Sequence, residues 1–269
     1  MSLRINSNVD ALQGYNNLNN TSSAVSKSME RLSSGFRVNR AADDTAGLSI
    51  SERMRGQIRG LAQATSNIGD AVSMVQTAEA ALGEVHGMLQ RARELAVQYK
   101  NGSLSTTDQA AIASEVGQLS AEITRIGSSA KFNGIDLLNN TNTVTFQVGA
   151  NDGDSIAVTN ANVATMVVPA SLAAAALATS TALAGIDAAI NNVSNQRAVY
   201  GAVQNRLEYA SNAQKSYHEN LVSAESRIRD VDMAQEMVSL TKNQVLAQAG
   251  TAMLAQANQA PQSVLSLLR

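Results

Sequence analysis

The sequence predicts a mainly α protein: a long antiparallel helical bundle or coiled coil with a small β-hairpin region and paired N- and C-terminal helices. Apolar residues recur at heptad spacing over stretches of more than fifty residues on both sides of a central segment. Aromatic residues make up only 3% of the chain, with two prolines and no tryptophan. Such a composition suits long helices that pack through small side chains.

The first predicted helix carries one narrow apolar stripe. Its spacings of seven, four, three and four residues form a heptad in which polar Ser22 takes one position. The stripe consists of Leu18, Val25, Met29, Leu32 and Phe36.

The second predicted helix runs from Asp44 to Tyr99 and has two apolar seams. One seam includes Ile58 and Leu61, and the other, offset from it, includes Met74 and Leu95. Two neighbouring seams require partners on more than one side, so this helix is expected to lie in a bundle. At 1.5 Å per residue it would be roughly 80 Å long.

A short helix and a β hairpin are predicted next. Ser105, with Asp108 three residues later, resembles a capping box at the helix start, and Gly127 and the Asn-Gly pair at 133–134 mark its end. The alternating "VTFQV" (144–148) and "SIAV" (155–158) are separated by turn residues and predict two paired strands. No other β segment is expected.

Residues 155–186 carry no charge and raise the alternative of a membrane span. The run is rich in alanine rather than leucine, is interrupted by Pro169, and lacks basic flanks. We therefore interpret it as the start of a helix with Ser171 as its N-cap.

The second half of the chain resumes the heptad, from Leu172 to Ile228. A last helix follows, with apolar residues on several faces, and Pro261 is expected to end it. Because two long helices flank the β segment, they should return antiparallel and bring the chain ends together. The predicted domains are a terminal coiled-coil domain (1–43 with 230–269) and a helical rod domain (44–229) with a hairpin excursion at about 140–170.

Composition and motifs argue against several function classes. The net charge of −2 and pI near 5.7 give no field that would attract nucleic acid or an anionic membrane. The chain has no cysteine, which excludes disulfides and thiolate metal sites, and its first thirty residues lack the apolar run of a cleavable signal peptide. We expect neither a nucleic-acid nor a membrane partner.

No catalytic motif is present either. Phosphate-binding glycine loops and the Gly-x-Ser-x-Gly elbow do not occur. "HENLV" at His218 misses the zinc motif because Val222 replaces the second histidine, and His86 is distant in sequence. "NDGD" (151–154) lacks a twelve-residue calcium loop. We expect no enzyme activity, no metal and no cofactor.

The chain ends pose a packing problem. Leu265, Leu267 and Leu268 lie at the C-terminus, where leucines should be covered. Residues 1–40 hold five basic and two acidic side chains, while residues 230–236 contain three acidic ones, which favours pairing of the ends. Apolar positions on several faces still need other cover. Copies that meet through unlike patches form an open helical array, so we expect neighbouring subunits to cover the leucines.

Seven segments then resemble a known family. "RLSSGFRVNRAADDTAGLSISERMRGQIRGL" (31–61), "QTAEAALGEVHGMLQRARELAVQ" (76–98) and "KFNGIDLL" (131–138) closely resemble bacterial flagellin. "RINSNVDAL" (4–12), "VQNRLEYA" (203–210), "AESRIRDVDMAQEM" (224–237) and "ANQAPQSVLSLLR" (257–269) do so too. The resemblance covers about residues 1–140 and 185–269. The middle departs from it, so the chain looks like a short flagellin without the large variable outer domains.

The resemblance implies a self-assembling subunit of the extracellular flagellar filament, used for swimming. It implies export of the unfolded chain through the flagellar type III apparatus, and terminal helices that line the filament interior. Implied partners are further copies of the chain, an export chaperone at about 230–269, and the filament cap and hook–filament junction proteins. The residues expected at subunit contacts are Leu18, Val25, Met29, Leu32, Phe36, Met233, Met237, Leu240, Val245, Leu265, Leu267 and Leu268.

The resemblance also implies contacts with host receptors. Some flagellins are sensed by Toll-like receptor 5 through the helix that matches "QRARELAVQ" (90–98), and the corresponding positions are Arg91, Leu95 and Glu115. Leu95 also belongs to a heptad seam, and both interpretations can hold. The final Leu267–Arg269 resembles the end that cytosolic innate receptors read.

Three alternatives stay open. A hook–filament junction protein shares flagellin-like ends, although its family matches less well through "QRARELAVQ" and the closing "LLR". Some flagellins house a protease in the variable region, but this middle is short and lacks the zinc motif. A secreted coiled-coil adhesin or translocator is the third alternative.

Overall fold

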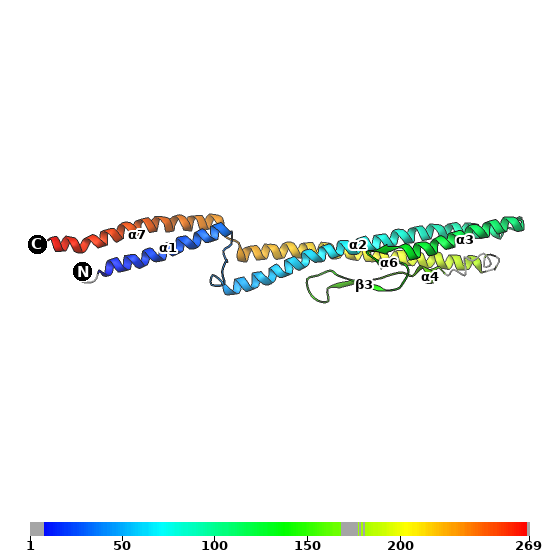
Figure 1. Cartoon of the computed structure of the whole chain (residues 1–269), viewed down its shortest axis with the longest axis horizontal. Coiled ribbons are helices and arrows are strands. Elements are labelled where there is room, and N and C mark those ends of the chain that lie inside the picture. The colour runs from blue at the N-terminus through cyan, green and yellow to red at the C-terminus, as the bar shows by residue number, and fades with distance from the viewer. Residues whose placement is uncertain (1–7, 168–176, 178, 180, 268–269) are drawn as a thin grey trace. The chain divides into compact units, whose positions relative to one another are not determined.

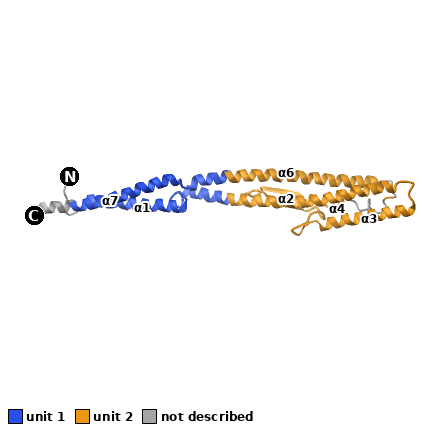
Figure 2. Ribbon diagram, turned by 90° about the horizontal axis from the view of Figure 1, so that it is seen from above, with its two compact units in different colours: residues 1–56, 220–269 blue, residues 57–219 orange. Residues whose placement is uncertain are grey.

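The structure is a computed structural model, and it describes residues 8–167, 177, 179 and 181–267. The mainly α fold with antiparallel strand pairs is confirmed (Figure 1). The chain forms two compact units, residues 1–56 with 220–269 (unit 1) and residues 57–219 (unit 2), as coloured in Figure 2. The long helices are α1 (Val9–Ser34), α2 (Thr45–Tyr99), α3 (Thr106–Ser129), α6 (Ala182–Arg229) and α7 (Met233–Leu267).

The core of unit 2 is built on the predicted seams of α2. Val75, Leu82 and Leu89 are completely buried and pack with residues of α3 and α6. Two ion pairs set the direction of α6 against α2: Arg93 Nε lies 2.6 Å from Asp187 Oδ1, and Arg197 Nη2 lies 3.6 Å from Glu79 Oε1. Since the higher number on α2 pairs with the lower on α6, the predicted antiparallel return is confirmed within this unit.

Helix α3 begins at the predicted capping box. The Ser105 hydroxyl accepts a hydrogen bond from the Asp108 backbone N–H at 3.2 Å, and the Asp108 carboxylate accepts one from the Ser105 N–H at 3.2 Å. This reciprocal pair satisfies donors that the first helical turn would otherwise leave unpaired.

The predicted hairpin is present as β3 (Thr143–Gln147) and β4 (Ser155–Thr159). The strands are antiparallel, with Thr143 opposite Thr159 and Gln147 opposite Ser155. Ile156 and Val158 of β4 point into the core of unit 2, while the alternating residues of the strand are exposed. One face of the hairpin therefore packs on the helices, and the other face is exposed.

A second strand pair was not predicted. β1 (Lys131–Phe132) pairs with β2 (Ile135–Asp136) around Asn133 and Gly134, whose φ angles are 48° and 79°. Positive φ at both central residues is the requirement of a tight hairpin turn, for which Asn-Gly is the favoured pair. The expectation of a single β segment is therefore wrong, because the Asn-Gly pair forms the turn of a second hairpin instead of only ending a helix. A short helix, α4 (Val163–Met166), follows β4.

The starts of two helices differ from the apolar patterns. α1 begins at Val9, ahead of Leu18 where the predicted stripe opens, because the Asn8 side chain caps it by accepting from the Ala11 N–H. The heptad was predicted to run from Leu172 to Ile228, but α6 begins at Ala182, and Thr179 and Thr181 just before it are not helical. The first positions of that heptad, Leu172 and Ala176, lie outside the described residues. The proposed N-cap at Ser171 lies outside the described residues.

The ends of the terminal helices also differ from prediction. α7 continues through Pro261 to Leu267, so this proline does not end the helix. A proline removes one backbone donor, but a helix can bend and continue past it. α1 ends at Ser34, because Gly35 takes the left-handed conformation, with φ 75° and its N–H bonded to the Arg31 carbonyl. Phe36 therefore lies beyond the helix whose stripe it was expected to close.

Candidate assembly surface on the terminal helices

The two terminal helices pair antiparallel in unit 1, as the sequence predicts. Asn8 near the start of α1 donates from Nδ2 to the Ala257 carbonyl near the end of α7, at 2.8 Å. Arg31 at the other end of α1 lies 3.6 Å from Glu236 in the first turn of α7. This ion pair joins the basic and acidic ends on which the pairing was predicted.

The seam between α1 and α7 includes two glycines that each meet a leucine of the opposite helix. A Cβ added at Gly14 would lie 3.4 Å from Leu254, and one added at Gly250 would lie 3.4 Å from Leu18. A groove of about 450 Å³ also runs along the pair, lined by residues that include Thr21. Among the described residues of both helices, only Ser28 and Leu240 are buried, at 5% and 6% exposure. Two helices alone therefore bury little of their apolar surface.

The remaining large apolar side chains are exposed on more than one side of the two helices, and together they are called the exposed apolar face. Among the described residues, ten of the seventeen large exposed hydrophobic side chains lie on these two helices. The exposed apolar face consists of Val9, Leu12, Tyr15 and Met29 on α1, with Met233, Met237, Val238, Val245, Leu246 and Met253 on α7. An apolar surface of this extent is typical of an interaction site rather than of a free monomer.

The predicted contact residues fall into two groups. Leu18, Val25 and Leu32 are half-buried on α1, and Leu240 is buried on α7. Met29, Met233, Met237 and Val245 are exposed by half or more. Only the second group is free to contact another molecule directly.

The last three predicted contacts receive no structural account. The backbone of Leu265 and Leu267 belongs to α7, but their side chains, and Leu268 entirely, lie outside the described residues.

Sequence reasoning missed several members of the exposed apolar face. Leu12, Val238 and Met253 are 62%, 71% and 67% exposed. They do not follow the narrow heptad stripe on which the selection was based. For Val238 and Met253, the signal that could have found them is the presence of apolar residues on several faces of the last helix. Met253 is among those apolar residues but was not selected as a contact.

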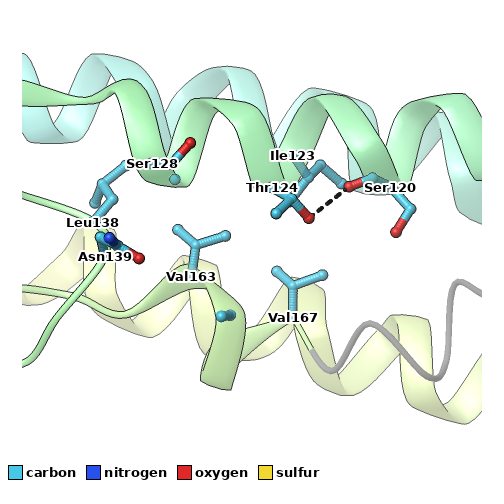
Figure 3. Close-up of a pocket in the computed structure, with 10 residues that line it drawn as sticks. Ser120, Ile123, Thr124, Ser128, Leu138, Asn139, Val163 and Val167 are labelled. Carbon is cyan, nitrogen blue, oxygen red and sulfur yellow. Dashed lines mark hydrogen bonds between the residues drawn. The ribbon is translucent and has the colours of Figure 1, made fainter.

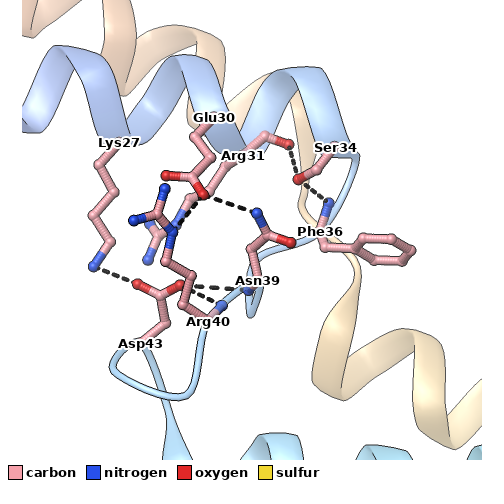
Figure 4. A network of polar contacts seen from close by, with 8 residues as sticks. All are labelled: Lys27, Glu30, Arg31, Ser34, Phe36, Asn39, Arg40 and Asp43. Atoms are coloured by element: carbon pink, nitrogen blue, oxygen red, sulfur yellow. Dashed lines mark hydrogen bonds and ion pairs between the residues drawn. The ribbon is translucent and has the colours of Figure 1, made fainter.

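The loop between α1 and α2 is held by a partly exposed network of charged and polar side chains (Figure 4). Asp43 accepts from Lys27 Nζ at 2.7 Å and from the Arg40 and Asn39 backbone N–H groups at 3.1 and 3.4 Å. The hydrogen bond from Lys27, followed by that from Arg40, lowers the pKa of Asp43 to about 2. Glu30 accepts from the side chains of both Asn39 and Arg40.

The start of this loop, just after α1, contacts the short segment between α6 and α7. Phe36 forms a β bridge with Asp230, and the Val231 N–H donates to the Gly35 carbonyl at 3.0 Å. The Arg229 guanidinium lies 4.7 Å from the centre of the Phe36 ring and donates to Glu52 at 2.7 Å. The hydrogen bond from Arg229 lowers the pKa of Glu52. Phe36 is thus part of an internal joint of unit 1.

The three predicted receptor contacts are only partly together on the surface of unit 2. Arg91 Nη2 donates to Glu115 Oε1 at 2.9 Å, and both side chains are about half exposed. This hydrogen bond is the main cause that raises the pKa of Arg91. Leu95 is 2% exposed and packs in the core. The structure therefore presents Arg91 and Glu115 outward and Leu95 inward.

A small pocket of about 90 Å³ lies between α3 and α4 in unit 2 (Figure 3). Ile123, Val163 and Val167 supply apolar walls, and the Thr124 hydroxyl donates to the Ser120 carbonyl of its own helix. No charged residue lines this pocket. It therefore holds no pair of groups suited to acid–base or nucleophilic chemistry.

In the part of the chain that the structure describes, no three histidine or carboxylate side chains gather as they would around a metal ion. No described helix is both long and apolar enough to cross a membrane.

Comparison with known proteins gives consistent matches over nearly the whole chain. The family model for the bacterial flagellin N-terminal helical region matches residues 5–143, and that for the C-terminal helical region matches residues 183–268. Flagellin of Halalkalibacterium halodurans is 49% identical over 270 residues, covering 98% of this chain and 99% of the relative. Flagellin of Bacillus subtilis is 48% identical, covering 99% and 100%. The flagellar filament 33 kDa core protein of Treponema phagedenis is also 48% identical, covering 98% and 99%.

Solved structures are similar as well. The crystal structure of Bacillus cereus flagellin matches with a TM-score of 0.51 at 29% identity, over 55% of this chain and 88% of that one. A putative flagellar hook-associated protein from Vibrio parahaemolyticus matches with a TM-score of 0.60 over 70% of this chain and 100% of that one. Its identity of 16% shows a shared fold alone.

Proposed function

The chain belongs to the bacterial flagellin family, and from that premise we propose how it acts: as a structural subunit of the flagellar filament, it buries its exposed apolar face between copies of itself. The observation that carries this proposal is the concentration of ten large exposed hydrophobic side chains on α1 and α7. Burying one Val, Leu or Met side chain fully contributes about 1.5–3 kcal/mol. Several such side chains per copy supply a driving force that the two-helix pair cannot obtain alone.

The contact is proposed to join unlike patches of successive copies. An interface of this kind repeats without closing and produces a helical filament. Within it, Met29, Met233, Met237 and Val245 would contact a neighbour directly, while Leu18, Val25, Leu32 and Leu240 hold the helix pair in shape. Leu265, Leu267 and Leu268 are proposed as further contacts on sequence grounds alone. The terminal domain of residues 1–43 and 230–269 is proposed to form the filament core.

Further partners are proposed from the family. An export chaperone would cover the apolar residues of about 230–269 before assembly, and the unfolded chain would leave the cell through the flagellar type III apparatus. The filament cap and the hook–filament junction proteins would meet the same terminal helices. The chain would thus act outside the cell and catalyse no reaction.

Contact with Toll-like receptor 5 is proposed through Arg91 and Glu115, whose side chains are exposed and paired. Leu95 would act indirectly, because it is buried and holds α2 in the bundle beneath Arg91.

Seeded elongation tests the proposed function. Sheared filament seeds would be mixed with the wild-type chain or with the double variant Val238→Asp/Val245→Asp, and filament length would be followed by electron microscopy. The variant places two carboxylates on the exposed apolar face, where burial of an unpaired charge is costly. We expect the wild type to lengthen the seeds and the variant not to do so.

The matched control is Val238→Leu/Val245→Leu, which keeps both positions apolar and should elongate seeds like the wild type. Circular dichroism of each variant would show that the helices are retained. Elongation by the aspartate variant at the wild-type rate would contradict the proposed interface. Failure of the wild type itself would favour a junction or adhesin role.

A further inference from the structure

The methionines of this chain divide sharply by exposure. The sequence has nine, of which Met1 lies outside the described residues. Met29, Met233, Met237 and Met253 are 54%, 51%, 50% and 67% exposed, and all four belong to the exposed apolar face. The other four are buried or half-buried: Met54, Met74, Met88 and Met166.

The exposed methionines occupy positions that assembly would use. Met233 and Met237 are four residues apart on α7 and so lie on the same side of the helix, one turn from each other. Met253 lines the groove between α7 and α1, beside Gly250 and Gly14. Met29 lies on α1, two residues from the Arg31 that pairs with Glu236.

Exposure decides how such side chains react with peroxide. The thioether sulfur attacks one oxygen of hydrogen peroxide, the O–O bond breaks, and the sulfur gains an S–O bond while the peroxide is reduced to water. The product, methionine sulfoxide, is polar and carries a strong hydrogen-bond acceptor. Only sulfurs that peroxide can reach react quickly, so the four exposed methionines should be oxidised first.

We propose that Met29, Met233, Met237 and Met253 are oxidation sites that control assembly: a subunit oxidised by peroxide while free cannot join a filament, whereas burial between subunits protects the same sulfurs afterwards. This inference rests on the proposed function. A sulfoxide oxygen buried in an apolar contact leaves an acceptor without a donor, while the free subunit keeps the oxygen in water. Oxidation therefore weakens assembly without unfolding the monomer.

The first experiment oxidises the free chain. Monomer would be treated with hydrogen peroxide, the sites located by peptide mass spectrometry, and seeded elongation measured. We expect the four exposed methionines to be converted before Met74 and Met88, and elongation to fall by about tenfold or more.

Two variants separate the sites. Met29→Leu/Met233→Leu/Met237→Leu/Met253→Leu keeps the face apolar without an oxidisable sulfur, and should elongate seeds equally well before and after peroxide. The matched control, Met54→Leu/Met88→Leu/Met166→Leu, keeps the four exposed sulfurs and should lose elongation like the wild type. Equal loss in the quadruple variant would overturn the proposal.

A third measurement needs no variant. Partly oxidised wild-type monomer would be offered to seeds, and sulfoxide at the four positions compared between pelleted filaments and the remaining supernatant. Depletion in the filaments is expected, and equal content in both fractions would overturn the proposal. Failure of untreated monomer to elongate would instead contradict the proposed function, so the two results can be told apart.

Discussion

At the scale of single residues, Tyr200 joins the segment after the β3–β4 hairpin to helix α6. Its side chain is 1% exposed, and its hydroxyl oxygen accepts a hydrogen bond from the Ala161 backbone N–H at 3.0 Å. Burial raises the pKa of the Tyr200 phenol. A buried donor such as this N–H is costly to leave unpaired, which explains why a tyrosine rather than a phenylalanine fits a position that is otherwise apolar.

We expect Tyr200→Phe to lower the free energy of unfolding by about 1–3 kcal/mol, because it leaves the Ala161 N–H buried without an acceptor. Chemical denaturation of the whole chain would measure the change in the free energy of unfolding. The control is Tyr209→Phe on the same helix, where the side chain is 76% exposed and the effect should be close to zero. Equal stability of both variants would contradict the assigned role.

Asp43 makes the loop of unit 1 sensitive to acid. Its pKa falls from 3.8 to about 2 on folding, so the folded state is favoured by the carboxylate above pH 4 and loses that contribution as the pH falls through 2. Asp43→Asn should therefore be less stable than the wild type at pH 7, by about 1 kcal/mol after solvent screening. The difference should disappear near pH 2.

Unfolding curves of the wild type and Asp43→Asn at several pH values would test this dependence. Asp152→Asn, at an exposed position in the β3–β4 turn, is the control. A stability difference that stays constant down to pH 2 would exclude the Asp43 carboxylate as its source.

At the scale of elements, the capping box of α3 shows how a local signal fixes a helix boundary. We expect Ser105→Ala to destabilise the protein by about 0.5–2 kcal/mol, because the Asp108 N–H loses its acceptor. Thermal melting followed by circular dichroism would measure it. Ser103→Ala, in the same loop and exposed, should melt like the wild type, and a similar loss there would refute the capping role.

The elements that could be predicted are those whose periodicity and boundary signals agree. The seams of α2, the cap at Ser105 and the alternation of β3 and β4 each follow from a few neighbouring residues. The start of α1 at Asn8 could not be found from apolar spacing, because the cap acts through a side-chain hydrogen bond ahead of the stripe. The interpretation of Asn133–Gly134 was wrong because this pair suits both a helix end and a tight hairpin turn. The interpretation of Pro261 was wrong because a helix can continue past a proline that removes one backbone donor.

The proposed assembly surface follows from the sequence only in part. The stripe that includes Met29 and the last helix that includes Met237 pointed to it, since apolar spacing identifies a helix face. Spacing does not tell which side of a helix a partner within the same chain already covers, so half-buried Leu18 and exposed Met29 were grouped together. Phe36 was grouped with them too, because its contacts with Arg229 and Asp230 join residues far apart in sequence.

At the scale of the whole molecule, the two units differ in how completely each buries its apolar residues. Unit 2 has a continuous core of α2, α3, α6 and the strand pairs. The paired terminal helices of unit 1 bury only Ser28 and Leu240 among their described residues. The proposed function explains this difference, because contacts between copies would complete the packing that the terminal helices lack.

The most direct test is a reconstruction by electron cryomicroscopy of filaments grown from this chain. We predict that Val238, Val245 and Met253, which are 59–71% exposed in the single chain, are buried in contacts between subunits. A map in which these side chains face solvent, with the filament held together through other surfaces, would contradict the account.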